Sequence, residues 1–169
     1  MKIIGKFIQN NWFYIAVYIT LLLAMIFRIY NLSERISLGS DHVRDVIIAK
    51  EALRRGELPL IGSFASAGPF VFGPLYYWFV MFALLILPFS FKTPWLLMTF
   101  VGLLTVAVMM RTGFLIGGKR LCIVLGLLTA FGPQFIARST FLSQHSLVGI
   151  TTALAVMFFV LLYQRKAFM

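Results

Sequence analysis

Five apolar stretches, separated by shorter polar or turn-rich segments, dominate the pattern of this chain. They are Trp12–Phe27, Leu75–Leu87, Trp95–Met110, Leu121–Ala137 and Leu147–Tyr163. A helix that spans a membrane needs about 20 largely apolar residues, with a range of roughly 17 to 25. With their flanking residues, all but the second stretch reach that length. The pattern therefore predicts four transmembrane helices, at about 11–30, 94–116, 120–137 and 146–163.

The second stretch is shorter than a spanning helix. It lies between Pro74 and Pro88, and apolar segments of about 10 to 14 residues are more often re-entrant or interfacial. It begins with the run Leu75-Tyr76-Tyr77-Trp78-Phe79, whose aromatic rings favour the headgroup layer of a membrane. We therefore predict an interfacial helix at 75–87.

Composition and charge support a multi-pass membrane protein. The chain is 61% hydrophobic and 12% charged, whereas soluble domains carry about 25% charged residues. Lys and Arg cluster on the cytoplasmic side of membrane proteins. Four spans place Lys2, Lys119-Arg120 and Arg165-Lys166 on that side together. We thus expect both termini inside, a long outer loop at about 31–93, and a short second outer loop at about 138–146.

The net charge of +10 raises the question of nucleic-acid binding. The basic residues stand at the ends of apolar segments and form no basic face with exposed aromatic residues, so we interpret them as orienting charges and expect no nucleic-acid partner. Cys122 is the single cysteine, and we expect a packed thiol. A transporter is disfavoured because none of the four predicted spans carries an acidic residue near the membrane midplane.

The long outer loop contains a predicted amphipathic helix at 41–55. Ser40 or Asp41 is a candidate N-cap, and Gly56 follows the last turn at the position that favours glycine. At 100° per residue, one side gathers Val43, Val46, Ala49 and Leu53, whereas Asp41 and Asp45 share a second face with Ile48 and Ala52 near it. The single module 1–169 is therefore an all-α membrane protein with two additional helices, 41–55 and 75–87, in its first outer loop.

The acidic residues mark the candidate chemistry, because all five lie between Glu34 and Glu57. Asp41 suits either a helix cap or a base that accepts a proton from a substrate hydroxyl beside the membrane. Asp45 is a candidate supporting residue for Asp41. It can pair with Arg44, or it can share a cation site with Asp41. Two carboxylates on one face would also suit a divalent metal. No larger metal-ligand pattern accompanies them, so no cofactor is assigned.

The second outer loop holds candidate groups for a phosphate. Arg138 and His145 lie close together in sequence there, with Gln144 beside them. A phosphate leaving group needs positive or hydrogen-bonding groups around it, and the Arg guanidinium fits phosphate oxygens. The alternative for Arg138 is a charge that extends to the interface from a helix end. Arg28, Arg35 and Arg44 have the same two interpretations.

Three motifs together resemble the start of the C-superfamily membrane glycosyltransferases, near the protein mannosyltransferases and the lipid A aminoarabinose transferase. They are the acidic run Ser40-Asp41-His42-Val43-Arg44-Asp45, the small, turn-rich stretch Gly62–Pro69, and the run Gly73-Pro74-Leu75-Tyr76-Tyr77-Trp78. The family usually runs to several hundred residues, so the chain resembles its N-terminal part. Segment 39–78 carries the specific similarity, and the remaining spans are generic.

The resemblance implies a multi-pass enzyme of the plasma or inner membrane whose active face is extracytoplasmic. Such enzymes transfer a sugar from a polyprenyl-phosphate carrier to an acceptor glycan, lipid or protein, with inversion at the anomeric carbon. The first-loop acid of the family corresponds to Asp41, and Asp45 matches a second acid. The alternative is a non-catalytic membrane remnant or small subunit that retains this module.

Overall fold

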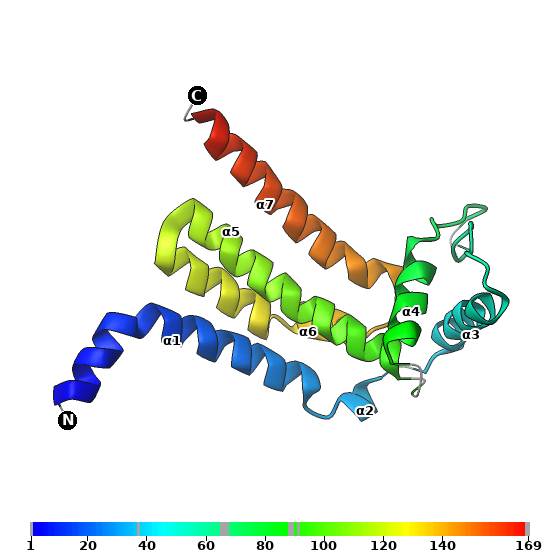
Figure 1. Cartoon of the computed structure of the whole chain (residues 1–169), viewed down its shortest axis with the longest axis horizontal. Coiled ribbons are helices and arrows are strands. Elements are labelled where there is room, and N and C mark those ends of the chain that lie inside the picture. Colours follow the sequence, from blue (N-terminus) through cyan, green and yellow to red (C-terminus); the bar gives the residue numbers. More distant parts are fainter. Residues whose placement is uncertain (1, 37, 65–67, 88–89, 91, 168–169) are drawn as a thin grey trace.

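The computed structural model describes residues 2–36, 38–64, 68–87, 90 and 92–167. Within these ranges the chain is mostly helical and has no strand, only one isolated bridge between Phe64 and Val71. The elements in chain order are α1 (Lys2–Ile29), α2 (Leu32–Arg35), α3 (Ser40–Arg55), α4 (Leu75–Ile86), α5 (Thr93–Phe131), α6 (Pro133–Arg138), the 3₁₀ turn η1 (Gln144–Leu147) and α7 (Val148–Ala167) (Figure 1).

Three helical segments of the described chain are long and apolar enough to cross a membrane. They are Asn11–Ile29, Thr93–Phe131 and Gln144–Arg165. Only 17% of the first apolar window and 11% of the third are buried by the rest of the protein. Such exposed apolar helices are expected where lipid covers them rather than water. The described chain is thus mostly helical, and its three long apolar helices are compatible with a membrane protein.

Helix α5 reverses direction at Gly117 and Gly118. Gly118 has φ 68° and ψ −155°, a backbone region that is essentially restricted to glycine. The two arms of α5 fold back beside each other (Figure 1). They pack closely, because a methyl group added at Gly126 would come within 2.7 Å of the Met110 side chain. The reversal lies between the helices expected at 94–116 and 120–137.

The last predicted turn of the 120–137 helix is separate in the structure. Helix α5 ends at Phe131, and α6 begins at Pro133. Proline has no backbone N–H and its ring displaces the preceding turn, so the helix breaks at Gly132. The carbonyls of Thr129 and Ala130 beside this break accept hydrogen bonds from Arg28 on α1.

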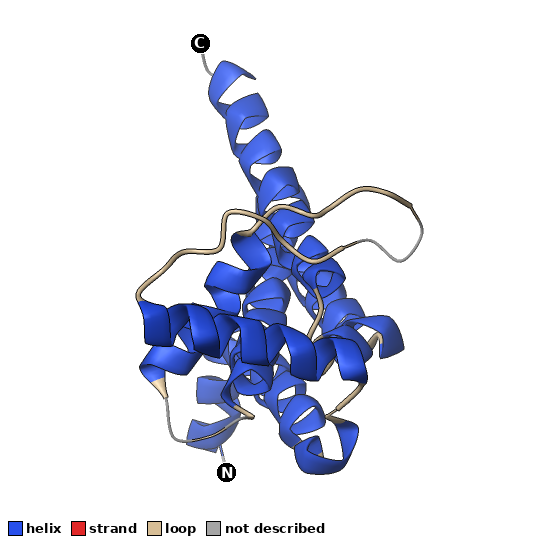
Figure 2. Ribbon diagram, turned by 90° about the vertical axis from the view of Figure 1, so that its right-hand side faces the viewer, coloured by secondary structure: helices blue, strands red, loops and turns tan. Residues whose placement is uncertain are grey.

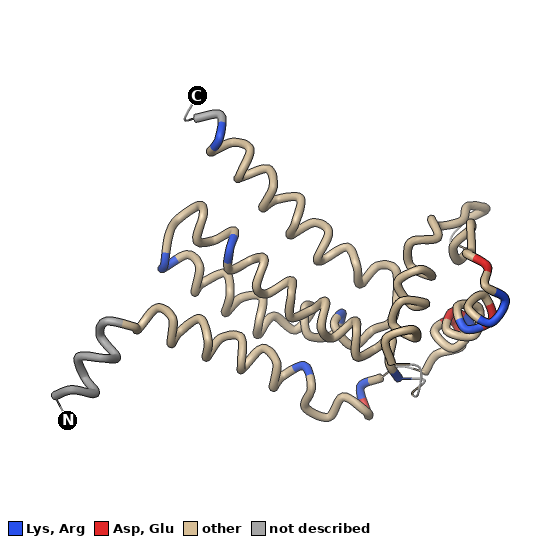
Figure 3. The backbone as a smooth tube through the Cα atoms, in the orientation of Figure 1, with Lys and Arg blue, Asp and Glu red and all other residues tan. Residues whose placement is uncertain are grey.

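The molecule has two distinct ends. Helices α2, α3 and α4 gather at one end, whereas both termini and the reversal of α5 lie at the other (Figure 1). The acidic residues are all drawn at the α2–α3 end (Figure 3). Helix α4 crosses the end of α5, and α3 lies in front of it when this end faces the viewer (Figure 2). We call this region the loop end.

The core of the loop end joins α3, α4 and α5. Its buried apolar residues include Val46, Val80, Trp95, Met98 and Leu142. Tyr76 and Tyr77 are also buried, with 3% and 4% of their surface exposed. The expectation that the rings at the start of α4 face the headgroup layer is therefore wrong for these two, because α4 is covered by α3 on one side and α5 on the other.

Helix α3 differs from the sequence expectation at its start and on its faces. Its N-cap is Gly39, and no side-chain hydrogen bond caps this end of the helix. Neither Ser40 nor Asp41 is therefore the N-cap. Its buried residues are His42, Asp45, Val46 and Ala49, which have the i, i+3, i+4, i+7 spacing of one helical face. Asp45 thus belongs to the packed face. The C-terminus ends as expected, with Gly56 at φ 70°.

Candidate functional site

A cavity of about 620 Å³ lies between α3 and the two loops of the loop end. We call it the acid cavity, because both carboxylates of the acidic run line it. Its lining residues are Asp41, His42, Arg44, Asp45, Ser63, Phe64, Phe70, Phe72, Phe141, Leu142, Ser143, Gln144 and His145. Volumes of this order are typical of small-molecule sites, which combine apolar walls with a few polar groups.

Arg44 connects the two carboxylates of the acid cavity. Its Nη1 donates to Oδ1 of Asp41 at 3.0 Å, and its Nη2 donates to Oδ1 of Asp45 at 3.0 Å. The side chain of Asp41 is 76% exposed, whereas that of Asp45 is 8% exposed. Asp41 is therefore the acid that an incoming molecule can reach, and Asp45 is the acid that holds the arginine.

Asp45 is fixed from the other side by α4. The hydroxyl of Tyr77 donates to Oδ1 of Asp45 at 3.3 Å. Burial, together with the neighbouring Asp45 carboxylate, raises the pKa of Tyr77 to about 12. The hydrogen bond to Asp45 also raises the pKa of Arg44. Arg44 thus stays charged, and the tyrosine stays a donor, throughout the neutral pH range.

The two loops are bonded to each other across the cavity. The Ser63 hydroxyl donates to Oε1 of Gln144 at 2.6 Å, which joins the first loop to η1. The Tyr76 hydroxyl of α4 donates to the carbonyl of Leu142 at 3.1 Å. The second loop is therefore held against α3 and α4, although some hundred residues of chain separate it from Asp41.

Both histidines pack edge-on against phenylalanines in the acid cavity. The His42 ring lies 4.5 Å from the Phe141 ring, and the His145 ring lies 5.6 Å from the Phe72 ring. The first pair links α3 to the second loop, and the second pair links the first loop to η1. His145 therefore does reach the cavity of Asp41, as a wall residue that is held by Phe72.

Arg138 faces a different cavity. Its Nη1 donates to the carbonyl oxygen of His145 at 3.1 Å, so it touches the backbone of His145 and not its ring. Arg138 lines a second cavity of about 450 Å³ among α1, α5, α6 and α7, which we call the bundle cavity. No residue lines both cavities. The two residues expected at one phosphate are thus divided between two cavities.

The cation position between the two aspartates is taken by the guanidinium of Arg44. Across the part of the chain that the structure describes, no three His, Cys, Asp or Glu residues come together as a metal site. The carboxylate pair is thus arranged as an ion-pair network.

Sequence reasoning missed the aromatic walls and the loop-to-loop bond of the acid cavity. Phe70, Phe72 and Phe141 stand among many apolar residues, and no local spacing distinguishes them from lipid-facing ones. The bond between Ser63 and Gln144 joins positions 81 residues apart. Such contacts depend on the tertiary fold, and a single sequence carries no local signal for them.

None of the protein-family models, curated proteins or solved structures compared with this chain matches it.

Proposed function

We propose that the chain is the N-terminal module of a membrane glycosyltransferase that takes a sugar from a polyprenyl-phosphate carrier and passes it to an acceptor. The observation that supports this proposal is the acid cavity at the end of the apolar helical bundle. The exposed carboxylate of Asp41 lines this cavity together with several phenylalanine rings. Phenylalanine rings suit the apolar faces of a sugar, and a carboxylate suits its hydroxyl groups.

The proposed topology has four crossings, with the two arms of α5 as separate crossings joined at Gly117 and Gly118. The reversal of α5 lies at the same end of the molecule as both termini (Figure 1). Lys119 and Arg120 directly follow that reversal, and positive residues favour the cytoplasmic side. This arrangement puts the acid cavity on the extracytoplasmic face of the plasma or inner membrane.

In the proposed reaction Asp41 is the general base. Its carboxylate takes the proton from the acceptor hydroxyl or amine as that atom attacks the anomeric carbon of the donor. The bond between the anomeric carbon and the phosphate oxygen breaks, and the lipid phosphate leaves with the bonding electrons. Attack opposite the leaving group inverts the configuration at the anomeric carbon.

Arg44 and Asp45 position Asp41 in this proposal. Arg44 holds Oδ1 of Asp41, and the buried Asp45 holds Arg44. Tyr77 anchors Asp45 to α4. An orientation fixed by such supporting bonds favours a productive geometry.

The donor phosphate is proposed to lie beside His145, which lines the acid cavity. Arg138 then contributes indirectly, because its hydrogen bond fixes the carbonyl of His145. Its charge faces the bundle cavity, so we assign it no direct contact with the donor.

The test is transfer from a labelled polyprenyl-phosphate sugar in membranes that contain the full-length protein. Asp41→Asn keeps the size of the side chain and removes its basicity. Glu51→Gln is the matched control, because Glu51 is an acid on the same helix that pairs with Arg54 and Arg55 outside the acid cavity. Loss of transfer in the first variant alone supports the proposal, and equal transfer in both variants refutes it.

The second candidate is a non-catalytic membrane module, and the Arg44 network favours it. Both carboxylates of the cavity already have a cationic partner, as acids with a purely structural role would. On this alternative Asp41→Asn changes stability slightly and leaves any transfer activity of the membranes unchanged. The same assay therefore separates the two candidates.

A further inference from the structure

The bundle cavity contains positive charge that no acidic residue balances. Arg28 and Arg138 both line it, and Arg28 is fully buried. The salt bridges among the described residues involve Arg44, Arg54 and Arg55. A buried or intramembrane charge is costly unless it is paired, so the cavity is suited to an anion.

Arg28 is held in place by backbone groups, and one of its buried donors has no acceptor in the protein. Its Nη1 donates to the carbonyls of Ala24 and Ala130, and its Nη2 donates to that of Thr129. Its Nε is buried without a hydrogen-bond partner. The protein therefore compensates this buried charge only in part, and an anion in the adjoining cavity would stabilise it further.

The polar groups are concentrated at the loop end of the cavity. Arg28 is in the last turn of α1 and Arg138 in the last turn of α6. Gln134, Ser139 and Ser146 line the same region. Glycine at position 102 lets α5 approach Arg28 and Ser139 closely, since a methyl group there would lie 3.3 Å from Nε of Arg28 and 2.4 Å from Cβ of Ser139.

The rest of the cavity is an apolar passage along α5 and α7. On α5 it extends from Met98 to Met109, and on α7 from Val148 to Val156. At 1.5 Å per residue the α5 side is about 16 Å long, which is half of the roughly 30 Å hydrocarbon thickness of a bilayer. The cavity thus has its charged residues at the loop end and an apolar length of about one leaflet.

We propose that the bundle cavity binds an anionic glycerophospholipid of the leaflet at the loop end. The phosphate accepts hydrogen bonds from the Arg138 guanidinium and lies beside the buried charge of Arg28, and one acyl chain lies along α5 and α7. Arginine matches phosphate geometry, and basic pockets between transmembrane helices bind lipid headgroups. The lipid is distinct from a transfer substrate, because the bundle cavity shares no residue with the acid cavity.

The experiment is native mass spectrometry of the full chain in detergent, titrated separately with phosphatidylglycerol, phosphatidylcholine and a polyprenyl phosphate. The wild-type chain is expected to bind phosphatidylglycerol about tenfold to a hundredfold more tightly than phosphatidylcholine, the range for a hydrogen bond to a charged group. Arg138→Gln should remove this preference without disturbing the core, because Arg138 is exposed.

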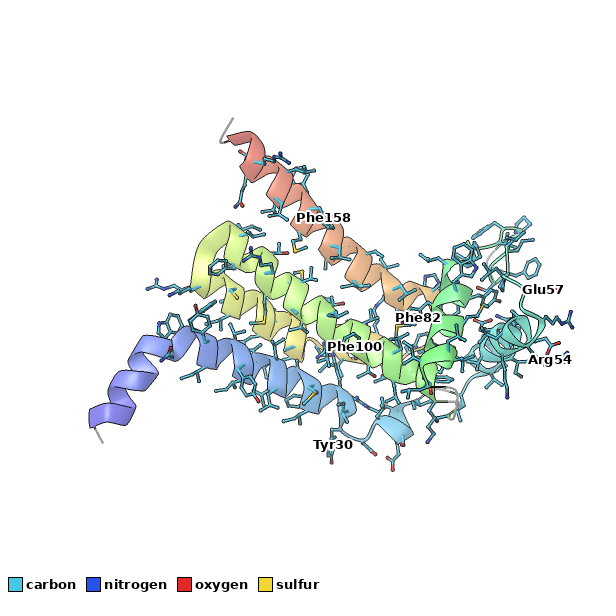
Figure 4. The ribbon with its side chains drawn as sticks, in the orientation of Figure 1. Tyr30, Arg54, Glu57, Phe82, Phe100 and Phe158 are labelled. Atoms are coloured by element: carbon cyan, nitrogen blue, oxygen red, sulfur yellow. The ribbon has the colours of Figure 1, made fainter. Side chains whose placement is uncertain are left out.

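Two further variants complete the test. Gly149→Leu fills the passage from a wall position with open space around it, and it should weaken the binding of both glycerophospholipids. Arg54→Gln is the control, because Arg54 lies on the outer side of α3 far from the bundle (Figure 4), and it should bind like the wild type. Equal affinity for the two glycerophospholipids, or an unchanged preference in Arg138→Gln, overturns the proposal. Preference for polyprenyl phosphate over phosphatidylglycerol also overturns it and assigns the cavity to a carrier lipid.

Discussion

The hydroxyl of Tyr77 on α4 donates a hydrogen bond to the buried carboxylate of Asp45 on α3, with 3.3 Å between the two oxygens. This contact joins the helix that carries the candidate base to the helix that crosses the end of the bundle. Because Asp45 in turn holds Arg44, the position of the acidic run depends on α4.

Tyr77→Phe is therefore expected to loosen the contact between α3 and α4. The ring and its packing remain, but buried Asp45 loses one donor, which costs about 1.5–3 kcal/mol for a hydrogen bond to a charged group. The measurement is the thermal unfolding midpoint in detergent. Tyr163→Phe is the control, since Tyr163 is exposed on α7. Equal midpoints for Tyr77→Phe and the wild type would show that the bond contributes nothing.

The same bond makes stability depend on alkaline pH. Burial beside Asp45 raises the pKa of Tyr77 to about 12 from an ordinary value of 10.0. A group whose pKa is raised on folding contributes its stability fully below the unfolded pKa and loses it as the pH rises through the folded pKa. The stability difference between wild type and Tyr77→Phe should thus shrink between pH 10 and 12. A difference that stays constant across that range would contradict this assignment.

Arg28 is expected to be essential for joining α1 to the far end of α5. Pro133 has no N–H to offer the carbonyl of Thr129, and the guanidinium of Arg28 supplies donors to Thr129 and Ala130 instead. Arg28→Gln should cost at least about 3 kcal/mol, because buried acceptors then lack donors. Arg111→Gln, an exposed arginine on α5, should stay within about 0.5 kcal/mol of wild type. Similar losses in both variants would refute the role of Arg28.

Gly118 should tolerate no side chain at the reversal of α5. Its φ of 68° with ψ −155° costs a residue with a Cβ about 1–3 kcal/mol, so Gly118→Ala should lower the unfolding midpoint. Gly149→Ala adds the same methyl group in open space and should change stability by no more than about 0.5 kcal/mol. If the two variants unfold alike, backbone conformation does not control the reversal.

The proposed four crossings can be tested by reporter fusions after Lys92, Arg120 and Lys166. The expected signals are outside, inside and inside, because the positive residues near the α5 reversal and the C-terminus favour the cytoplasm. An inside signal at Lys92 would show that α4 crosses the membrane.

The sequence predicted the parts of this fold that depend on local pattern. Apolar length indicated the long helices, Gly56 marked a helix end, and the gap between the spans expected at 94–116 and 120–137 marked the reversal of α5. The helix that carries Asp41 begins at Ser40, one residue before its expected start.

The tertiary contacts could not be predicted in the same way. The burial of Asp45 follows from the covering of α3 by α4, and Arg138 faces the bundle because α6 turns after the break at Pro133. Both outcomes depend on how helices distant in sequence pack, and hydrophobic periodicity within one helix does not contain that information. The periodicity of α3 was ambiguous, since His42 and Asp45 complete an apolar face with Val46.

The most direct test of the central proposal is the ratio of initial transfer rates between Glu51→Gln and Asp41→Asn membranes at equal protein abundance. General-base assistance is worth about 10²–10⁴-fold. A true base at Asp41 therefore predicts a ratio of at least about one hundred, with membrane insertion unchanged. A ratio near one would show that the exposed carboxylate of Asp41 only pairs with Arg44, and would contradict the assignment of the acid cavity as a catalytic site.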